Sequence, residues 1–291
     1  MRASVPLLRT ALFLAFGLAL TSERVSESFQ QASPAQSASR TYLGFDRNDY
    51  PGDAALEILR KTFAFSGYWL NAPPGESSNS WHGKREILNS HGFGFLVLFN
   101  GRLDRELKAP NNAILLGASD AAAAVEAVKK EEFPGGTIVF LDQEEGGRML
   151  PEQRSYVYAW VDAVNKAGFR AGIYCSGIPV REARGVIVTT AIDLRDNEEG
   201  RKIIFFVYND ACSPSTGCAF PSNPSPPTQS GIPFAAIWQF AQSPRRRALT
   251  ASCPSHYDSD GNCYAPLLQR ADRVHLDVDS ATSPDPSSGR R

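Results

Sequence analysis

Eight short apolar runs with the length and composition of β-strands alternate along this chain with stretches suited to helices. They are Tyr42–Asp46, Phe65–Leu70, Phe93–Phe99, Thr137–Leu141, Ala171–Cys175, Ile203–Tyr208, Phe234–Phe240 and Val274–Asp279. This alternation is typical of parallel strands joined by crossover helices. Eight strands over about 240 residues match the ~250 residues of a (β/α)8 barrel. We therefore predict an α/β fold, a single TIM-type barrel domain spanning residues 41–279.

Two of the helices between these runs have clear end signals. The stretch Ser119–Lys130 combines an N-cap residue, strong helix formers and two terminal lysines that suit the helix dipole. Pro151 suits the first turn of a second helix, which we expect to end near Ala167, before Gly168. An open doubly wound sheet is the alternative architecture, but no glycine-rich phosphate loop follows the first strand.

The two ends of the chain do not read as parts of the barrel. Arg2 and Arg9 flank the start of an apolar run over residues 11–20, so we expect a signal peptide over residues 1–22 and a secreted or periplasmic protein. That run is about half of the ~20 residues that a membrane span needs, so we expect no stable span after cleavage; a permanent anchor is the alternative. The polar compositions of residues 23–40 and 280–291 predict a disordered linker and a disordered tail.

Charge and cysteine content exclude several classes of function. The chain has 30 basic and 31 acidic residues, so we expect no nucleic-acid partner. Separately, we expect the protein to be a monomer. The basic run Arg245–Arg247 reads as a solvated loop, although it would also suit an anionic wall polymer. The histidines and cysteines lack the spacing of metal ligands, and we expect neither a metal nor a cofactor.

The five cysteines fit an exported protein. Cys212 and Cys218 lie close together in one polar loop, and Cys253 and Cys263 bracket another, so these two local disulfides are predicted. Cys175 falls inside an apolar strand, where a buried and inert thiol is expected.

Acidic residues stand at the ends of several predicted strands, and in a barrel these ends share one mouth. They are Asp46, Asp142, Glu144, Asp277 and Asp279. Barrel enzymes build their active sites at this face. Side chains two apart on a strand point the same way, so Asp142 and Glu144 should share a pocket while Gln143 faces away. Crowded, partly buried carboxyls keep a proton donor beside an ionised partner, as glycosidic cleavage requires. The alternative is that such carboxylates only cap loops or helices.

Four short motifs then resemble, in their order, the landmarks of the family 25 lysozyme-like glycoside hydrolases. They are Gly44-Phe45-Asp46, Asp142-Gln143-Glu144, Trp238-Gln239-Phe240 and Leu276-Asp277-Val278-Asp279. The segment from Ser119 to Gly177 resembles more closely the related glycoside-hydrolase-like domain of unknown function found in exported bacterial proteins. The resemblance covers Tyr42 to Asp279 and implies a lysozyme-like enzyme acting on an N-acetylated, peptidoglycan-type polysaccharide.

Carried over by position, the resemblance implies that Glu144 is the general acid, and that Asp142 stabilises charge or orients a substrate acetamido group. Asp46 and Asp277 would complete the acidic floor. In substrate-assisted glycosidases the N-acetyl group of the sugar is the nucleophile, which would explain why no protein nucleophile is evident. Glu145 follows directly and is an alternative acid, although strand alternation should turn it away from Glu144.

Aromatic and amide side chains on the later strands are candidates for binding sugar, since sugar faces stack on rings. We assign this role to Trp238, Gln239, Tyr174 and Tyr208. A non-catalytic carbohydrate-binding or wall-associated barrel is the alternative function. Four convergent carboxyls favour the enzyme, because binding alone relies more on aromatic platforms. Hydrolysis of a different glycan stays open, since fold does not fix substrate.

Overall fold

The computed structural model describes residues 40–210, 217–244, 257, 260–268 and 273–290. Three features predicted from the sequence lie outside these residues: the signal peptide, the linker up to residue 39, and the basic run 245–247. From residue 39 onward the chain forms one compact unit.

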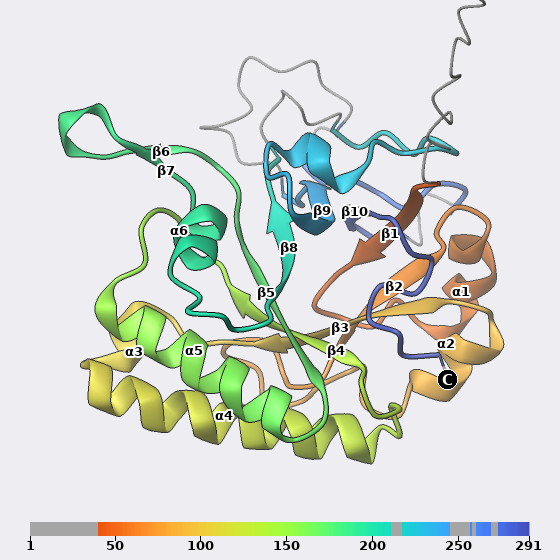
Figure 1. The fold of residues 1–291 in the computed structure, drawn as a ribbon. Coiled ribbons are helices and arrows are strands. Elements are labelled where there is room, and N and C mark those ends of the chain that lie inside the picture. The colour runs from red at the N-terminus through yellow and green to blue at the C-terminus, as the bar shows by residue number, and fades with distance from the viewer. Residues whose placement is uncertain (1–39, 211–216, 245–256, 258–259, 269–272, 291) are drawn as a thin grey trace, which may run out of the picture. The chain divides into compact units, whose positions relative to one another are not determined.

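Eight strands close into a barrel, as the sequence predicts (Figure 1). They are β1 (Tyr42–Asp46), β2 (Phe65–Trp69), β3 (Gly94–Asn100), β4 (Ile138–Gln143), β5 (Arg170–Ser176), β8 (Ile204–Tyr208), β9 (Ala235–Ala241) and β10 (Asp277–Ala281). In this order each strand pairs with the next, and β10 pairs with β1 to complete the circle. All pairs formed among the first seven strands are parallel.

The eighth strand corrects the expectation of an all-parallel barrel. β10 is antiparallel to both β9 and β1, and Asp277 at its start pairs with Asp46 at the end of β1. Because the strand is reversed, its first residue lies at the mouth of the barrel and its last residue lies at the opposite end. Asp277 therefore reaches the mouth as the first residue of the strand, and Asp279 lies deeper inside.

Helices cover the outside of the sheet between successive strands. They are α1 (Asp53–Arg60), α2 (Arg85–Ser90), α3 (Asp104–Leu107), α4 (Pro110–Lys130), α5 (Pro151–Lys166) and α6 (Thr190–Asp196), with short 3-10 turns η1 (Ala183–Gly185) and η2 (Pro227–Ser230). α4 starts nine residues before the predicted Ser119. α4 and α5 lie side by side, and the hairpin of β6 (Val180–Arg181) and β7 (Ile187–Val188) extends away from the sheet (Figure 1). No helix in the described part of the chain is long and apolar enough to cross a membrane.

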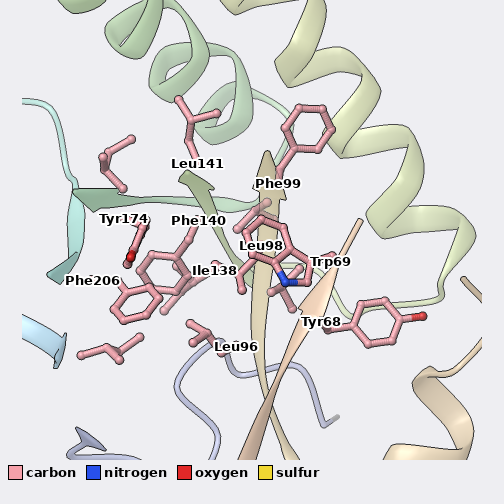
Figure 2. Packing of buried hydrophobic residues seen from close by; sticks show 14 of the residues in the cluster. Tyr68, Trp69, Leu96, Leu98, Phe99, Ile138, Phe140, Leu141, Tyr174 and Phe206 are labelled. Atoms are coloured by element: carbon pink, nitrogen blue, oxygen red, sulfur yellow. The ribbon is translucent and has the colours of Figure 1, made fainter. Parts of the chain in front are cut away.

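Strand alternation divides the apolar residues between the barrel interior and the helix layer. Figure 2 shows Phe99 and Leu141 directed toward the helices, while Leu98 and Phe140 lie on the other face of the same strands. All four are at most 6% exposed. Interior rings also contact each other, since the centroids of Phe140 and Phe206 are 6.0 Å apart. The interior is thus a packed core beneath the mouth.

The C-terminal segment, expected from its composition to be disordered, packs against the bottom of the barrel. Ser287 Oγ accepts a hydrogen bond from the Val97 amide at 2.8 Å, and the Ile138 amide donates to the Ser287 carbonyl at 2.9 Å. Gly94 has no side chain where this segment crosses, and a Cβ there would lie 1.9 Å from the Pro284 carbonyl oxygen. Backbone hydrogen bonding and close approach therefore order a sequence that lacks apolar periodicity.

The cysteine pairing also differs from the prediction. Cys218 and Cys263 form a disulfide with a Cα–Cα distance of 5.4 Å, although they are 45 residues apart in sequence. Cys212 and Cys253 lie outside the described residues. Proximity in sequence was a poor guide because the fold brings Cys218 and Cys263 together across 45 positions. Cys175 is a buried free thiol, and burial raises its pKa, as expected of an inert cysteine.

Candidate active site

A cavity of about 1150 Å³ opens at the mouth of the barrel and gathers the predicted acidic residues. Asp46 ends β1, Asp142 lies near the end of β4, and Asp277 begins β10. Glu144 follows β4 on the loop and is exposed. All four line the cavity. Three different strands and one loop thus bring four carboxyls to one space, although they are up to 231 positions apart in the chain.

Burial dominates the electrostatics of this cluster. Loss of water raises the pKa of Asp46 to about 6, with a smaller increase from the charge of Glu144. Burial and the negative charge of Glu144 raise the pKa of Asp142 well above its usual value. Burial and the negative charge of Asp46 also raise the pKa of Asp277, and the positive charge of Arg47 partly offsets this increase. Burial and neighbouring carboxyls thus raise the pKa values of Asp46, Asp142 and Asp277 together, so the charge state of each depends on the others.

A directed chain of hydrogen bonds ends at Asp46. Gln242 Nε2 donates to the Tyr174 hydroxyl at 2.9 Å, and that hydroxyl donates to Gln239 Oε1 at 2.7 Å. Gln239 Nε2 in turn donates to Asp46 Oδ2 at 2.7 Å. Each donor is oriented by the group before it. The chain therefore favours the charged form of Asp46, and it opposes the effect of burial on the pKa of this carboxyl.

The loop after β4 holds the two adjacent glutamates in opposite directions. The Tyr208 hydroxyl donates to the Glu144 carbonyl oxygen at 2.6 Å and fixes the backbone at the cavity wall. Glu145 Oε2 accepts from the Asp104 amide at 2.8 Å and from Gln153 Nε2 at 2.6 Å. Glu145 does not line the cavity and supports the starts of α3 and α5, whereas Glu144 lines the cavity.

The candidate sugar-binding residues separate into two groups. Gln239, Tyr174 and Tyr208 line the cavity, and the rings of Tyr174 and Tyr208 have centroids 5.3 Å apart, forming an aromatic wall. Trp238 does not line the cavity, which corrects its assignment. Because it is one residue from Gln239 on β9, it points to the other face, where it is fully buried and its Nε1 donates to the Asn209 carbonyl at 3.0 Å.

Three residues in or near the cavity were assigned no site role from the sequence. Trp69, at the end of β2, lines the cavity and is 5% exposed. Gln242 lines it and orients Tyr174. Asp279 is fully buried, and its carboxyl interacts with that of Asp46. Trp69 lies at the end of a predicted strand, which was the signal available for it. Asp279 was expected at the mouth with Asp277, and the reversed direction of β10 places it deeper.

The other side of the cavity is polar and built from ion pairs. Arg102 donates to both oxygens of Asp120 at 2.6 and 2.8 Å, and the Tyr156 hydroxyl donates to the same carboxyl at 2.9 Å. Arg102 and Asp120 both line the cavity. Among the described residues, no group of three or more His, Cys, Asp and Glu side chains is placed to hold a metal ion. The cavity thus presents carboxyl, phenol, amide and guanidinium groups.

Fold and cavity together define a TIM-type barrel with an acidic site at its mouth. No family model matches the chain, and no curated protein matches it in sequence. Among solved structures it is similar to an uncharacterized B. stearothermophilus protein, with 18% identity, a TM-score of 0.51, and coverage of 82% of this chain and 95% of that one. This similarity supports the barrel fold and does not extend to activity.

Two further structures are more distantly similar. The Mycobacterium tuberculosis Tat-secreted protein Rv2525c in complex with L-tartrate has 13% identity and a TM-score of 0.48, over 85% of this chain and 97% of that one. The Clostridium perfringens spore cortex lytic enzyme SleM has 16% identity and a TM-score of 0.48, over 84% of this chain and 68% of that one.

Proposed function

We propose that this chain is an exported glycoside hydrolase that cleaves an N-acetylated, peptidoglycan-type polysaccharide. The observation that carries the proposal is the convergence of Asp46, Asp142, Glu144 and Asp277 on one cavity. The cavity volume of about 1150 Å³ exceeds the ~300–1000 Å³ of most small-molecule pockets and suits several linked sugars. The disulfide between Cys218 and Cys263 supports an oxidising compartment.

Asp142 and Glu144 act as a coupled pair in this proposal. Because Asp142 lies deeper and its pKa is raised, it holds the proton in the free protein. Glu144 is exposed at the mouth, where a glycosidic oxygen can reach it. A bound glycan removes water from Glu144 and favours its protonated form. The two carboxyls therefore titrate together, and the proton is available at the outer carboxyl once substrate is bound.

Cleavage then follows the substrate-assisted course that the family resemblance implies. Glu144 passes its proton to the leaving glycosidic oxygen as the C–O bond breaks. The acetamido oxygen of the sugar bonds to the anomeric carbon, while Asp142 orients the acetamido group. Water then adds to the anomeric carbon, the acetamido oxygen leaves, and a proton returns to Glu144. The charged Asp46 stabilises the positive charge that develops on the sugar.

The test is the release of reducing ends from purified peptidoglycan by the protein, compared with Glu144→Gln and with Glu145→Gln as a matched control. We expect Glu144→Gln to lose about 10²–10⁴-fold in rate, the usual contribution of a general acid. Glu145→Gln should keep most of the activity, because its side chain faces α3 and α5.

Two outcomes would redirect the assignment. Equal activity in Glu144→Gln and wild type would show that another group donates the proton. No hydrolysis by any of the three proteins, with glycan binding retained, would support the alternative of a non-catalytic carbohydrate-binding barrel.

A further inference from the structure

Asp279 is a buried carboxyl that the proposed mechanism leaves without a role. It lies in β10, paired with Gly44 of β1 on one side and Gln239 of β9 on the other. Its side chain is fully buried, and among the described residues neither of its oxygens has a hydrogen-bond partner in standard geometry. The carboxyl that acts on it most strongly is that of Asp46. A hydrogen bond between these two carboxyls requires a proton on one of them.

The hydrogen-bond donors around the two carboxyls indicate which of them carries the charge. Gln239 lies near both, but its Nε2 makes its 2.7 Å hydrogen bond to Asp46 Oδ2. Tyr174 fixes the orientation of Gln239 by donating to its Oε1 at 2.7 Å. Asp46 thus has a held amide donor, whereas Asp279 has none of comparable geometry. Two buried carboxyls in contact do not both ionise, and the proton stays on the one with weaker support for its charge.

The surrounding charges do not reverse this order. The other ionisable groups that change the pKa values of Asp46 and Asp279 are acidic. The charge of Glu144 raises the pKa of Asp46, and the charge of Asp277 raises the pKa of Asp279. Asp142 and Tyr174 also interact with Asp46. The nearby cation, Arg47, acts on Asp277. Burial raises the pKa of Asp279 well above its usual value, whereas the pKa of Asp46 rises only to about 6.

We propose that Asp279 is a positioning residue that stays protonated near neutral pH and donates a hydrogen bond to Asp46. With Gln239 on the other side, it holds Asp46 as the charged carboxylate at the floor of the cavity. This inference deepens the proposed function, because a fixed negative charge there would stabilise a developing oxocarbenium ion. The arrangement itself is a property of the folded protein and can be tested without activity.

The test is a titration of the Asp46 carboxyl by ¹³C NMR in wild type, Asp279→Asn and Asp279→Leu. The amide of Asp279→Asn can donate in place of the acid, so the pKa of Asp46 should stay within about half a unit of wild type. Asp279→Leu removes the donor and should raise that pKa by about one unit, the size of a lost hydrogen bond to a charged group. Asp196→Asn, on an exposed position of α6, should leave it unchanged.

A charged Asp279 would give results of the opposite sign. Neutralising it would remove a like charge, so Asp279→Asn would lower the pKa of Asp46 by a unit or more and overturn the proposal. This result needs only the Asn variant, so poor folding of Asp279→Leu does not obscure it. If the wild type hydrolyses glycan, the acid limb of its pH profile should move up in Asp279→Leu and return in Asp279→Asn. If it does not, the proposed function fails while the titration still decides the role of Asp279.

Discussion

At the scale of single residues, the cavity contains a carboxyl, Asp46, whose charged form is disfavoured by burial. Asp46 and Gln239 are 193 residues apart in sequence, yet their hydrogen bond at 2.7 Å opposes the effect of burial on the pKa of Asp46. Asp46 is 5% exposed, and its pKa of about 6 lies above the unfolded value near 3.8. The folded protein therefore binds more protons than the unfolded chain between these two pH values, and folding is less favourable once Asp46 is charged.

This shift predicts how Asp46 changes stability with pH. The contribution of Asp46 to the free energy of unfolding is fully present below about pH 4 and is lost as pH rises through about 6. For a pKa shift of this size the loss is roughly 3 kcal/mol. Asp46→Asn should therefore gain stability relative to wild type by more at pH 7 than at pH 3.5. Chemical denaturation at the two pH values measures the difference. The control Asp196→Asn should change stability by the same small amount at both pH values. If Asp46→Asn also changed stability by the same amount at both pH values, this result would contradict the raised pKa of Asp46.

The sequence allowed a site residue to be predicted where the residue stands at the end of a recognisable strand. Asp46 and Asp142 stand directly after or within clear apolar runs, and Glu144 follows two positions on, so alternation placed all three at the mouth. Trp238 was misplaced because parity within β9 depends on a register that sequence does not show. The hydrogen-bond chain to Asp46 was invisible, since it joins residues on β1, β5 and β9.

At the scale of elements, β2 must approach β1 closely for Asp46 to reach the cavity. A Cβ on Gly67 of β2 would lie 2.5 Å from the Asp46 Cβ and 3.0 Å from its Cα. Glycine is therefore required here by contact with a neighbouring strand. The same strand ends at Trp69, which lines the cavity two residues further on.

Gly67→Ala should consequently displace Asp46 and strain the β1–β2 pair. Overpacking of this kind costs about 1–3 kcal/mol, and we expect a lower Tm together with a loss of glycan hydrolysis. Gly135→Ala is the matched control, because a Cβ there meets nothing within 4 Å. Thermal unfolding and a hydrolysis assay on both variants test the contact. If Gly67→Ala matches Gly135→Ala in both measurements, the close approach of the two strands does not position Asp46.

The number and sequence positions of the strands followed from composition, whereas the direction of β10 did not. All eight predicted runs overlap observed strands, because β-branched and aromatic residues bounded by turn residues mark buried strands. Direction depends on the connection between β9 and β10, which carries no helix signal in the sequence. Alternating Asp277-Val278-Asp279 looked like the end of a parallel strand and is instead the start of an antiparallel one.

At the scale of the whole molecule, long-range contacts complete the fold at both ends of the barrel. The segment after β10 crosses the bottom, where Asp285 Oδ1 accepts a hydrogen bond from the Phe95 amide at 2.8 Å across 190 positions. The Cys218–Cys263 disulfide links the chain before β9 to the chain before β10. Neither could be read from local sequence, since the polar composition of the tail suggested disorder and the spacing of the cysteines suggested two local disulfides. The barrel leaves one end closed by chain and the other open at the acidic cavity.

The most direct test of this account is a crystal structure of Glu144→Gln with an N-acetylated peptidoglycan oligosaccharide. We predict that the glycan lies in the cavity, with a glycosidic oxygen within hydrogen-bond distance of the side chain at position 144 and an acetamido group beside Asp142. An oligosaccharide bound elsewhere on the surface, or one in the cavity with no glycosidic oxygen near position 144, would contradict the assignment of the active site.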